Sequence, residues 1–182
     1  MLVYLVVFCE VAFWALLAGG LSFLYIFKKP KVGGVLLALS PGVDAVLLVA
    51  TAFDLRAGSP AVFAHVLSVI YLAMALVYGR RMVRWMDVRF NHRFCGGPAP
   101  EKKAKGGRAH AAQERAGWLR HLAMFSIACI GASSLALFSG HPQEVAEAYL
   151  PTFRLWGIIV AIDFVVSFSY TLFPRKEDNA RG

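Results

Sequence analysis

Three carboxylic acids lie inside long apolar stretches of this sequence, where an ionisable side chain is unexpected. They are Glu10, Asp44 and Asp163. A charge in hydrocarbon is costly, so such a residue usually has a function and a partner. At ~1.5 Å per residue across a core of ~30 Å, all three fall between the midplane and the outer face of a membrane. The sequence therefore predicts that they line one shared, hydrated site.

Other polar residues fall near the same depth. His65 borders it from a third apolar segment, and Asp163, Ser167 and Tyr170 follow the i, i+4, i+7 spacing of one helix face. These residues complete a candidate intramembrane polar site of Glu10, Asp44, His65, Asp163, Ser167 and Tyr170. The alternative is that each acid is protonated and separately hydrogen-bonded to a hydroxyl or a backbone carbonyl. On that interpretation Asp163 pairs with His65 or with Arg154, and Asp44 pairs with neighbouring groups.

A helix breaker precedes Asp44 by about one turn. Pro41 removes a backbone donor and Gly42 loosens the helix, so the segment is expected to kink there. The carbonyls that this break frees, together with Ser40, could satisfy a protonated Asp44. The same break could instead act as the gate of a transport site.

The composition is that of a membrane protein. Hydrophobic residues make up 58% of the 182 residues and charged residues 16%, against roughly 45–50% and 25% in soluble domains. Five apolar segments have the ~20 residues that a transmembrane helix needs. We therefore predict an all-α bundle of five transmembrane helices in a single membrane domain, 1–182, with an uncleaved first span. The predicted spans are 2–27, 32–53, 61–78, 119–138 and 152–173, with a cytoplasmic loop at 80–118.

The loops between these segments alternate in charge. Seventeen of the 19 basic residues fall on one side, whereas the other side has only Arg56 and Arg154. Loops rich in lysine and arginine face the cytoplasm. This predicts an N-terminus outside, a C-terminus inside, and a multi-pass location in the bacterial cytoplasmic membrane.

The loop after the third span begins with an arginine-rich segment, which is predicted to form an interfacial amphipathic helix that continues this span on the cytoplasmic side. On a helix, its apolar residues share one side and most of its basic residues lie on the other. Its arginines could simply extend to lipid phosphates from the end of the span. Alternatively, they form a docking surface for anionic lipid or a partner. The candidate docking residues are Arg80, Arg81, Arg84, Arg89 and Arg93.

Several kinds of chemistry lack support. The five histidines provide no facing pair at one depth for haem, and no spacing selects zinc. There is no GxSxG, HExxH or glycine-rich phosphate loop, and the three cysteines form no metal-binding or disulfide pattern. The basic loop carries no nucleic-acid-binding motif. We expect no cofactor, no bound metal, no nucleic-acid partner and no enzymatic activity.

A resemblance rests on three stretches: Glu10 to Trp14, Tyr78 to Phe94, and Ser169 to Arg175. With these, the chain resembles small integral membrane proteins of actinobacteria and bacilli described as YmcC-like. The resemblance covers nearly the full length and implies a bacterial cytoplasmic membrane. It implies no activity and no functional residue, although it draws attention to the arginine-rich segment and to Asp87.

Two functions remain open. The first is a non-enzymatic accessory or scaffold protein that acts on a membrane-protein partner, a second copy of itself, or anionic lipid on the cytoplasmic face. The second is a small proton- or cation-coupled permease that uses Glu10, Asp44 and Asp163. They differ in whether the three carboxyls converge.

Overall fold

The computed structural model describes residues 2–100 and 106–173, and these ranges contain helices and short connections. The basic residues of 101–105 and 174–182, which contribute to the predicted charge asymmetry, lie outside the described residues. In chain order the helices are α1 (Leu2–Tyr25), α2 (Pro30–Arg56), α3 (Phe63–Cys95), α4 (Gly107–Ser139) and α5 (Pro142–Leu172).

All five helices are long and apolar enough to cross a membrane, which confirms the predicted fold class. Large apolar side chains such as Val7, Leu76 and Leu137 are more than half exposed. Such surface requires a hydrocarbon environment, since soluble proteins rarely expose apolar patches of this extent. The chain is therefore a multi-pass membrane protein.

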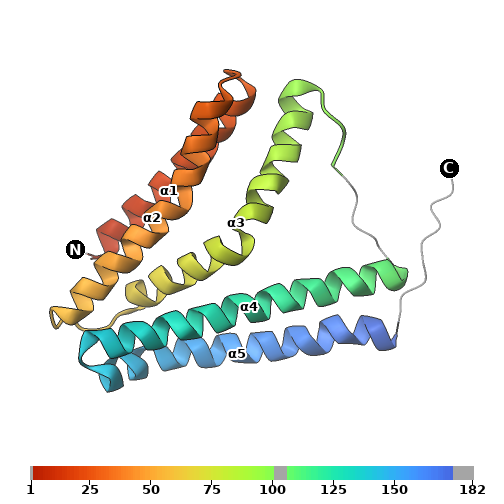
Figure 1. The fold of residues 1–182 in the computed structure, drawn as a ribbon. Helices are drawn as coiled ribbons and strands as arrows, with labels where there is room; N and C mark the ends of the chain where they lie inside the picture. The colour runs from red at the N-terminus through yellow and green to blue at the C-terminus, as the bar shows by residue number, and fades with distance from the viewer. Residues whose placement is uncertain (1, 101–105, 174–182) are drawn as a thin grey trace.

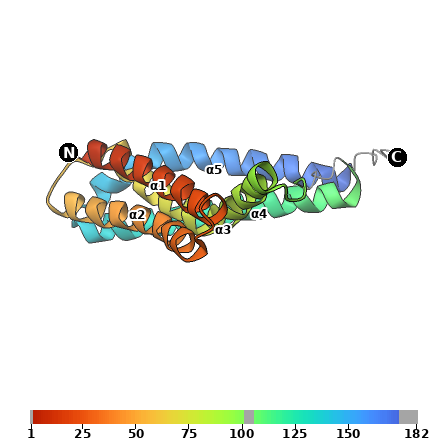
Figure 2. The ribbon, with the colours of Figure 1, turned by 90° about the horizontal axis from the view of Figure 1, so that it is seen from above.

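The helices form two diverging arms with α3 between them (Figure 1). One arm is the α1–α2 hairpin and the other is the α4–α5 hairpin. The N-terminus and the turns α2–α3 and α4–α5 lie together at what we call the closed end. The opposite ends carry most of the basic residues, and we call them the basic end. From above, the α4–α5 pair extends past the α1–α2 hairpin (Figure 2).

The α1–α2 arm depends on a close approach of two backbones. A Cβ added to Gly33 would lie 2.6 Å from the carbonyl oxygen of Gly20, and one added to Gly20 would lie 2.8 Å from Leu37. Small residues at such a crossing let transmembrane helices touch along their backbones. Pro30 opens α2, where its missing N–H is not needed.

The middle helix, α3, contacts both arms. Its first half packs against α4, where Val69 lies beside Gly131, and the main apolar core forms there from α2, α3, α4 and α5. Figure 1 shows α3 changing direction near its middle. Its second half reaches α1, where the Tyr25 hydroxyl donates to Asp87 and the Tyr25 ring lies 5.8 Å from that of Phe90.

Two turn glycines end the long helices at opposite ends of the bundle. Gly96 follows α3 with a φ of 67°, and Gly140 follows α4 with a φ of 82°. These left-handed conformations favour glycine and stop a helix. Pro142 then occupies the first turn of α5, as the sequence predicts.

Some helix ends differ from the predicted spans. Helices α4 and α5 begin at Gly107 and Pro142, well before the predicted starts at residues 119 and 152. Helix α3 has 33 residues, or about 50 Å, and includes the arginine-rich segment that was expected to be helical. Helix α2 continues through Pro41, which is exposed together with Gly42, and the kink expected there stays a prediction.

Candidate functional site

The first polar group joins α1, α2 and α3 in the half of the bundle near the N-terminus. The Tyr71 hydroxyl on α3 donates to Glu10 Oε2 on α1 at 2.6 Å. Asp44 on α2 lies near enough for its charge to interact with those of Glu10 and Tyr71. Glu10 is exposed, whereas Asp44 is 7% exposed. Two of the three predicted carboxyls are therefore neighbours.

The polar face of α2 is buried but sparsely hydrogen-bonded. Ser40 Oγ and Thr51 Oγ1 have no hydrogen-bond partner among the described residues, although Ser40 is 3% and Thr51 0% exposed. The structure assigns no hydrogen bond between Ser40 and Asp44 within the same ranges. Ser40 therefore does not take part in the predicted hydrogen-bonded network with Asp44.

The second polar group closes the α2–α3 turn. His65 is 1% exposed, and its Nδ1 accepts from the Val62 backbone N–H at 3.0 Å. The ring hydrogen must then lie on Nε2, which donates to Asp54 Oδ2 at 2.9 Å. Ser59 donates to the other oxygen of Asp54 at 3.0 Å. Every polar atom of the His65 ring is thus occupied in holding the start of α3 to the end of α2.

The third polar group links α4 to α5 in the other arm. The indole Nε1–H of Trp156 can only donate, and it lies 2.9 Å from His121 Nε2. His121 Nδ1 therefore carries the ring hydrogen and donates to Asp163 Oδ2 at 3.1 Å. One turn away along the chain, Trp118 donates to the backbone carbonyl of Val160 at 3.1 Å. These bonds fix the direction of the Asp163 side chain.

The predicted site is therefore divided. Helix α5 does not contact α1 or α2 among the described residues, so Asp163 does not join Glu10 and Asp44. His65 pairs with Asp54 rather than with Asp163. Asp163 turns toward α4 because His121 and Trp156 satisfy it there. The three-carboxyl arrangement on which the permease hypothesis depends is not assembled.

The remaining predicted residues lie with Asp163 in the second arm. Ser167 is 2% exposed and lines a cleft described below. The ring of Tyr170 lies 4.9 Å from that of His110 on α4. The i, i+4, i+7 face of α5 thus does turn inward, but toward α4 and α3.

A cleft of about 600 Å³ lies between the first half of α4, α5 and the part of α3 near its change of direction. Its polar lining includes Arg81, Glu114, His121 and Asp163, and its aromatic lining includes Trp85. The volume falls in the range of small-molecule sites, ~300–1,000 Å³. Polar groups from three helices therefore converge on this cleft.

Exposed arginines follow one another along the second half of α3, and one of them, Arg81, lines this cleft. Arg80, Arg81, Arg84 and Arg93 are all exposed. Within residues 2–100 and 106–173, each ion pair has a histidine as its cation, so none of these arginines is neutralised by a carboxylate. Arg89 is different, since its guanidinium lies 3.7 Å from the centre of the Trp85 ring. Four of the five predicted docking residues are thus available to an external anion.

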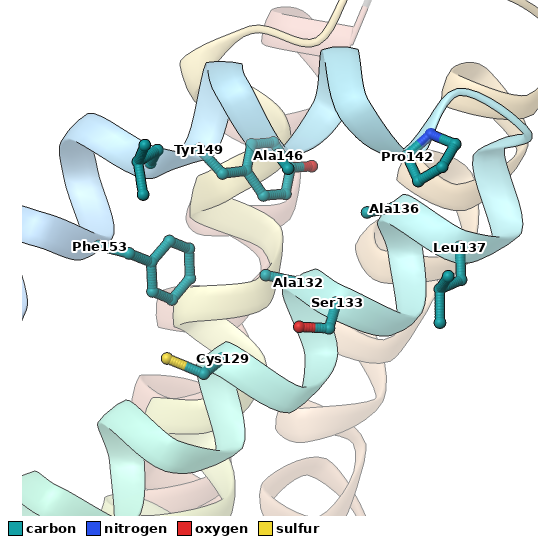
Figure 3. A pocket seen from close by; sticks show the side chains of 10 residues that line it. Cys129, Ala132, Ser133, Ala136, Leu137, Pro142, Ala146, Tyr149 and Phe153 are labelled. Carbon is teal, nitrogen blue, oxygen red and sulfur yellow. The ribbon is translucent and has the colours of Figure 1, made fainter.

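A second groove lies at the closed end between α4 and α5 (Figure 3). Small residues of α4 such as Ala132 and Ala136 form one side, and the rings of Tyr149 and Phe153 on α5 form the other. It is almost entirely apolar, and neither its Cys129 nor its Ser133 lies in a described hydrogen bond with a base. It offers packing surface rather than chemistry.

Trp156 is expected to stabilise the third polar group through its N–H. Replacing it with phenylalanine keeps the aromatic packing but leaves His121 Nε2 without a donor, which should cost about 1 kcal/mol. Equilibrium unfolding of the purified protein in mixed micelles measures this. Trp85→Phe is the matched control, since the Trp85 N–H donates to no acceptor among the described residues. Equal stabilities of the two variants would contradict the assigned hydrogen bond.

Comparison with known proteins supports the membrane assignment. The chain is 36% identical over 177 residues to the "Uncharacterized membrane protein YmcC" of Bacillus subtilis (strain 168), which covers 96% of this chain and 93% of that protein. The chain belongs to the YmcC family. No family model and no solved structure match it. The resemblance seen in the sequence is confirmed, and it extends over nearly the whole YmcC-type chain.

The sequence did not reveal which side chains hydrogen-bond with the predicted site residues in this YmcC-family bundle. Tyr71, Asp54, His121 and Trp156 were not among the predicted site residues. For His121 and Asp163 a signal existed: α4 and α5 are antiparallel and joined at Gly140 by a short turn. Residues about equally far from such a turn meet, to within about one helical turn. For Tyr71 and Glu10 no comparable short turn joins the two helices.

Proposed function

We propose that this YmcC-family protein is a non-enzymatic accessory component of the bacterial cytoplasmic membrane. It acts through its basic end on anionic lipid or on a membrane-protein partner. The observation that carries this proposal is the set of exposed, unpaired guanidinium groups on α3 at Arg80, Arg81, Arg84 and Arg93. Each such cation near an anionic surface contributes about 1 kcal/mol of attraction.

The position of these arginines supports a surface role. They follow a transmembrane stretch on the same helix, and their apolar neighbours Met82, Met86 and Phe90 are less exposed than they are. An arginine without a protein partner at the membrane interface forms charge-assisted hydrogen bonds to phosphate or carboxylate. The charge asymmetry of the loops supports a cytoplasmic location for this end.

The state of the two intramembrane histidines supports a non-enzymatic role. A general base needs a ring nitrogen that is free to take a proton. In His65 and His121 both nitrogens are used by neighbours in the protein. These rings join helices rather than face a reactant.

The test measures lipid selectivity in bilayers. Spin-labelled phosphatidylglycerol is expected to associate with the wild-type protein more strongly than spin-labelled phosphatidylcholine. The triple variant Arg80→Gln, Arg84→Gln, Arg93→Gln should reduce that preference severalfold, and added salt should have a similar effect. Arg81 is left intact because it lines the cleft.

The matched control is the double variant Arg56→Gln, Arg154→Gln, which removes the two basic residues predicted to lie on the outer side. It should leave the preference unchanged. An affinity purification of wild type and triple variant in mild detergent tests the partner role in parallel. Unchanged lipid selectivity together with unchanged co-purifying proteins would contradict the proposal.

A further inference from the structure

The cleft between α3, α4 and α5 has a graded lining. Along α3 toward the basic end its residues run from Met74 through Tyr78 and Arg81 to Trp85. Along α4 in the same direction they run from Met124 through His121 to Glu114. Both walls therefore change from apolar to polar toward the basic end. A phospholipid that enters the cleft from the side would match this order. Its acyl chains would lie in the apolar part, and its headgroup would lie in the polar part at the membrane interface.

The polar part of the cleft contains both signs of charge on different helices. Arg81 lies on α3, whereas Glu114 lies on α4 and Asp163 on α5. Arg81 is exposed and has no carboxylate partner among the described residues. A purely anionic headgroup would be repelled by the carboxylates, and a simple cation would be repelled by the guanidinium. A headgroup with a phosphate next to an ammonium can pair with both signs of charge.

Both carboxylates keep oxygens that a ligand can reach. The Glu114 side chain is 40% exposed and its contact with His110 is 3.9 Å, which is longer than a hydrogen bond. The Asp163 side chain is 38% exposed, and His121 occupies only its Oδ2. A primary ammonium has three donors. It can therefore donate to a carboxylate oxygen that is still free, whereas a quaternary ammonium has no N–H to donate.

The apolar part suits an acyl chain. Met74 and Met124 line it, and unbranched methionine side chains adapt to irregular apolar ligands. Trp85 and Trp118 lie on the polar side, where indole rings favour the level of the headgroups. The cleft therefore resembles a site for a whole phospholipid molecule rather than for a soluble ion.

We propose that this cleft binds one phospholipid whose headgroup carries a phosphate and a primary ammonium, as in phosphatidylethanolamine. Arg81 binds the phosphate, and Glu114, which lies nearer the basic end, binds the ammonium. Asp163 stays bonded to His121 deeper in the cleft. This inference goes beyond the proposed surface role, since it concerns one bound lipid of a defined class rather than attraction to a charged membrane.

The test is native mass spectrometry of the full-length protein in detergent. Phosphatidylethanolamine, phosphatidylcholine and phosphatidylglycerol with the same acyl chains are added in turn. Phosphatidylethanolamine is expected to bind about tenfold more tightly than phosphatidylcholine, which corresponds to one charge-assisted hydrogen bond. Glu114→Gln should reduce this ratio severalfold, and Arg81→Gln should weaken binding of all three lipids.

Glu114→Gln is the decisive variant because the Glu114 side chain is partly exposed. The substitution also leaves the hydrogen bond between His121 and Asp163 in place, since Glu114 takes no part in it. Glu147→Gln, an exposed acid near the closed end of α5, is the matched control and should change nothing. Equal binding of phosphatidylethanolamine and phosphatidylcholine would overturn the proposal, as would an unchanged ratio in Glu114→Gln. A preference for phosphatidylglycerol would also overturn it, while leaving the surface role of the other arginines intact.

Discussion

Replacing Gly33 with leucine is expected to lower the free energy of unfolding by about 3 kcal/mol, the upper range for an overpacked site. Even a Cβ at this position would lie 2.6 Å from the Gly20 carbonyl oxygen and 2.9 Å from the Leu24 backbone nitrogen. Both of these atoms are backbone, so neither can move aside by changing a rotamer. Helices α1 and α2 would have to separate.

The control for this prediction lies at the next residue. A Cβ at Gly34 meets nothing within 4 Å, so Gly34→Leu adds the same side chain on the exposed side of the same helix. Equilibrium unfolding of both variants by SDS in mixed micelles compares them directly. The close backbone contact between α1 and α2 would be refuted if Gly33→Leu were as stable as Gly34→Leu.

Replacing His65 with leucine is expected to lower stability by about 2 kcal/mol. Leucine has a similar size, so little packing is lost. However, the change removes the bond from His65 Nε2 to Asp54 Oδ2 and the acceptor for the Val62 N–H. It leaves Asp54 Oδ2 and the Val62 N–H without these partners, although Ser59 still donates to Asp54 Oδ1.

Unfolding measurements again test this expectation, with His141→Leu as the control. His141 is exposed in the α4–α5 turn at the same end of the bundle, so its loss should change stability little. Asp54→Asn separates the roles of charge and hydrogen bonding, because the amide keeps an acceptor oxygen for Nε2. A His65→Leu variant with wild-type stability would show that the α2–α3 turn does not depend on this ring.

The helices could be predicted from the sequence because their signal is long and simple. Five apolar stretches of about the right length, with charged loops between them, determine where helices cross the membrane. Exact helix ends were less accessible, because polar residues beyond the apolar stretch can continue a helix. Helices α4 and α5 begin at Gly107 and Pro142, well before the predicted spans at residues 119 and 152.

The grouping of the polar residues could not be predicted because it depends on helix rotation. Helix α5 is about equally apolar on all sides, so its sequence does not reveal which face meets α4. Asp163 lies beside His121 rather than beside the residues predicted for it. His121 and Trp156 decide its direction, and each of them alone looks like an isolated polar residue in an apolar span.

The course of α3 couples the two arms mechanically. Its first half is packed against α4 at Val69 and Gly131, and its second half is fastened to α1 by Tyr25 and Asp87. Narrowing or widening the space between the arms therefore requires α3 to flex near its middle, where the only glycine of this helix, Gly79, removes side-chain hindrance. Because Tyr71–Glu10 and His65–Asp54 hold the α1–α2 hairpin to the first half of α3, such flexing would move mainly the basic ends of the helices, where Arg81 and Trp85 line the cleft.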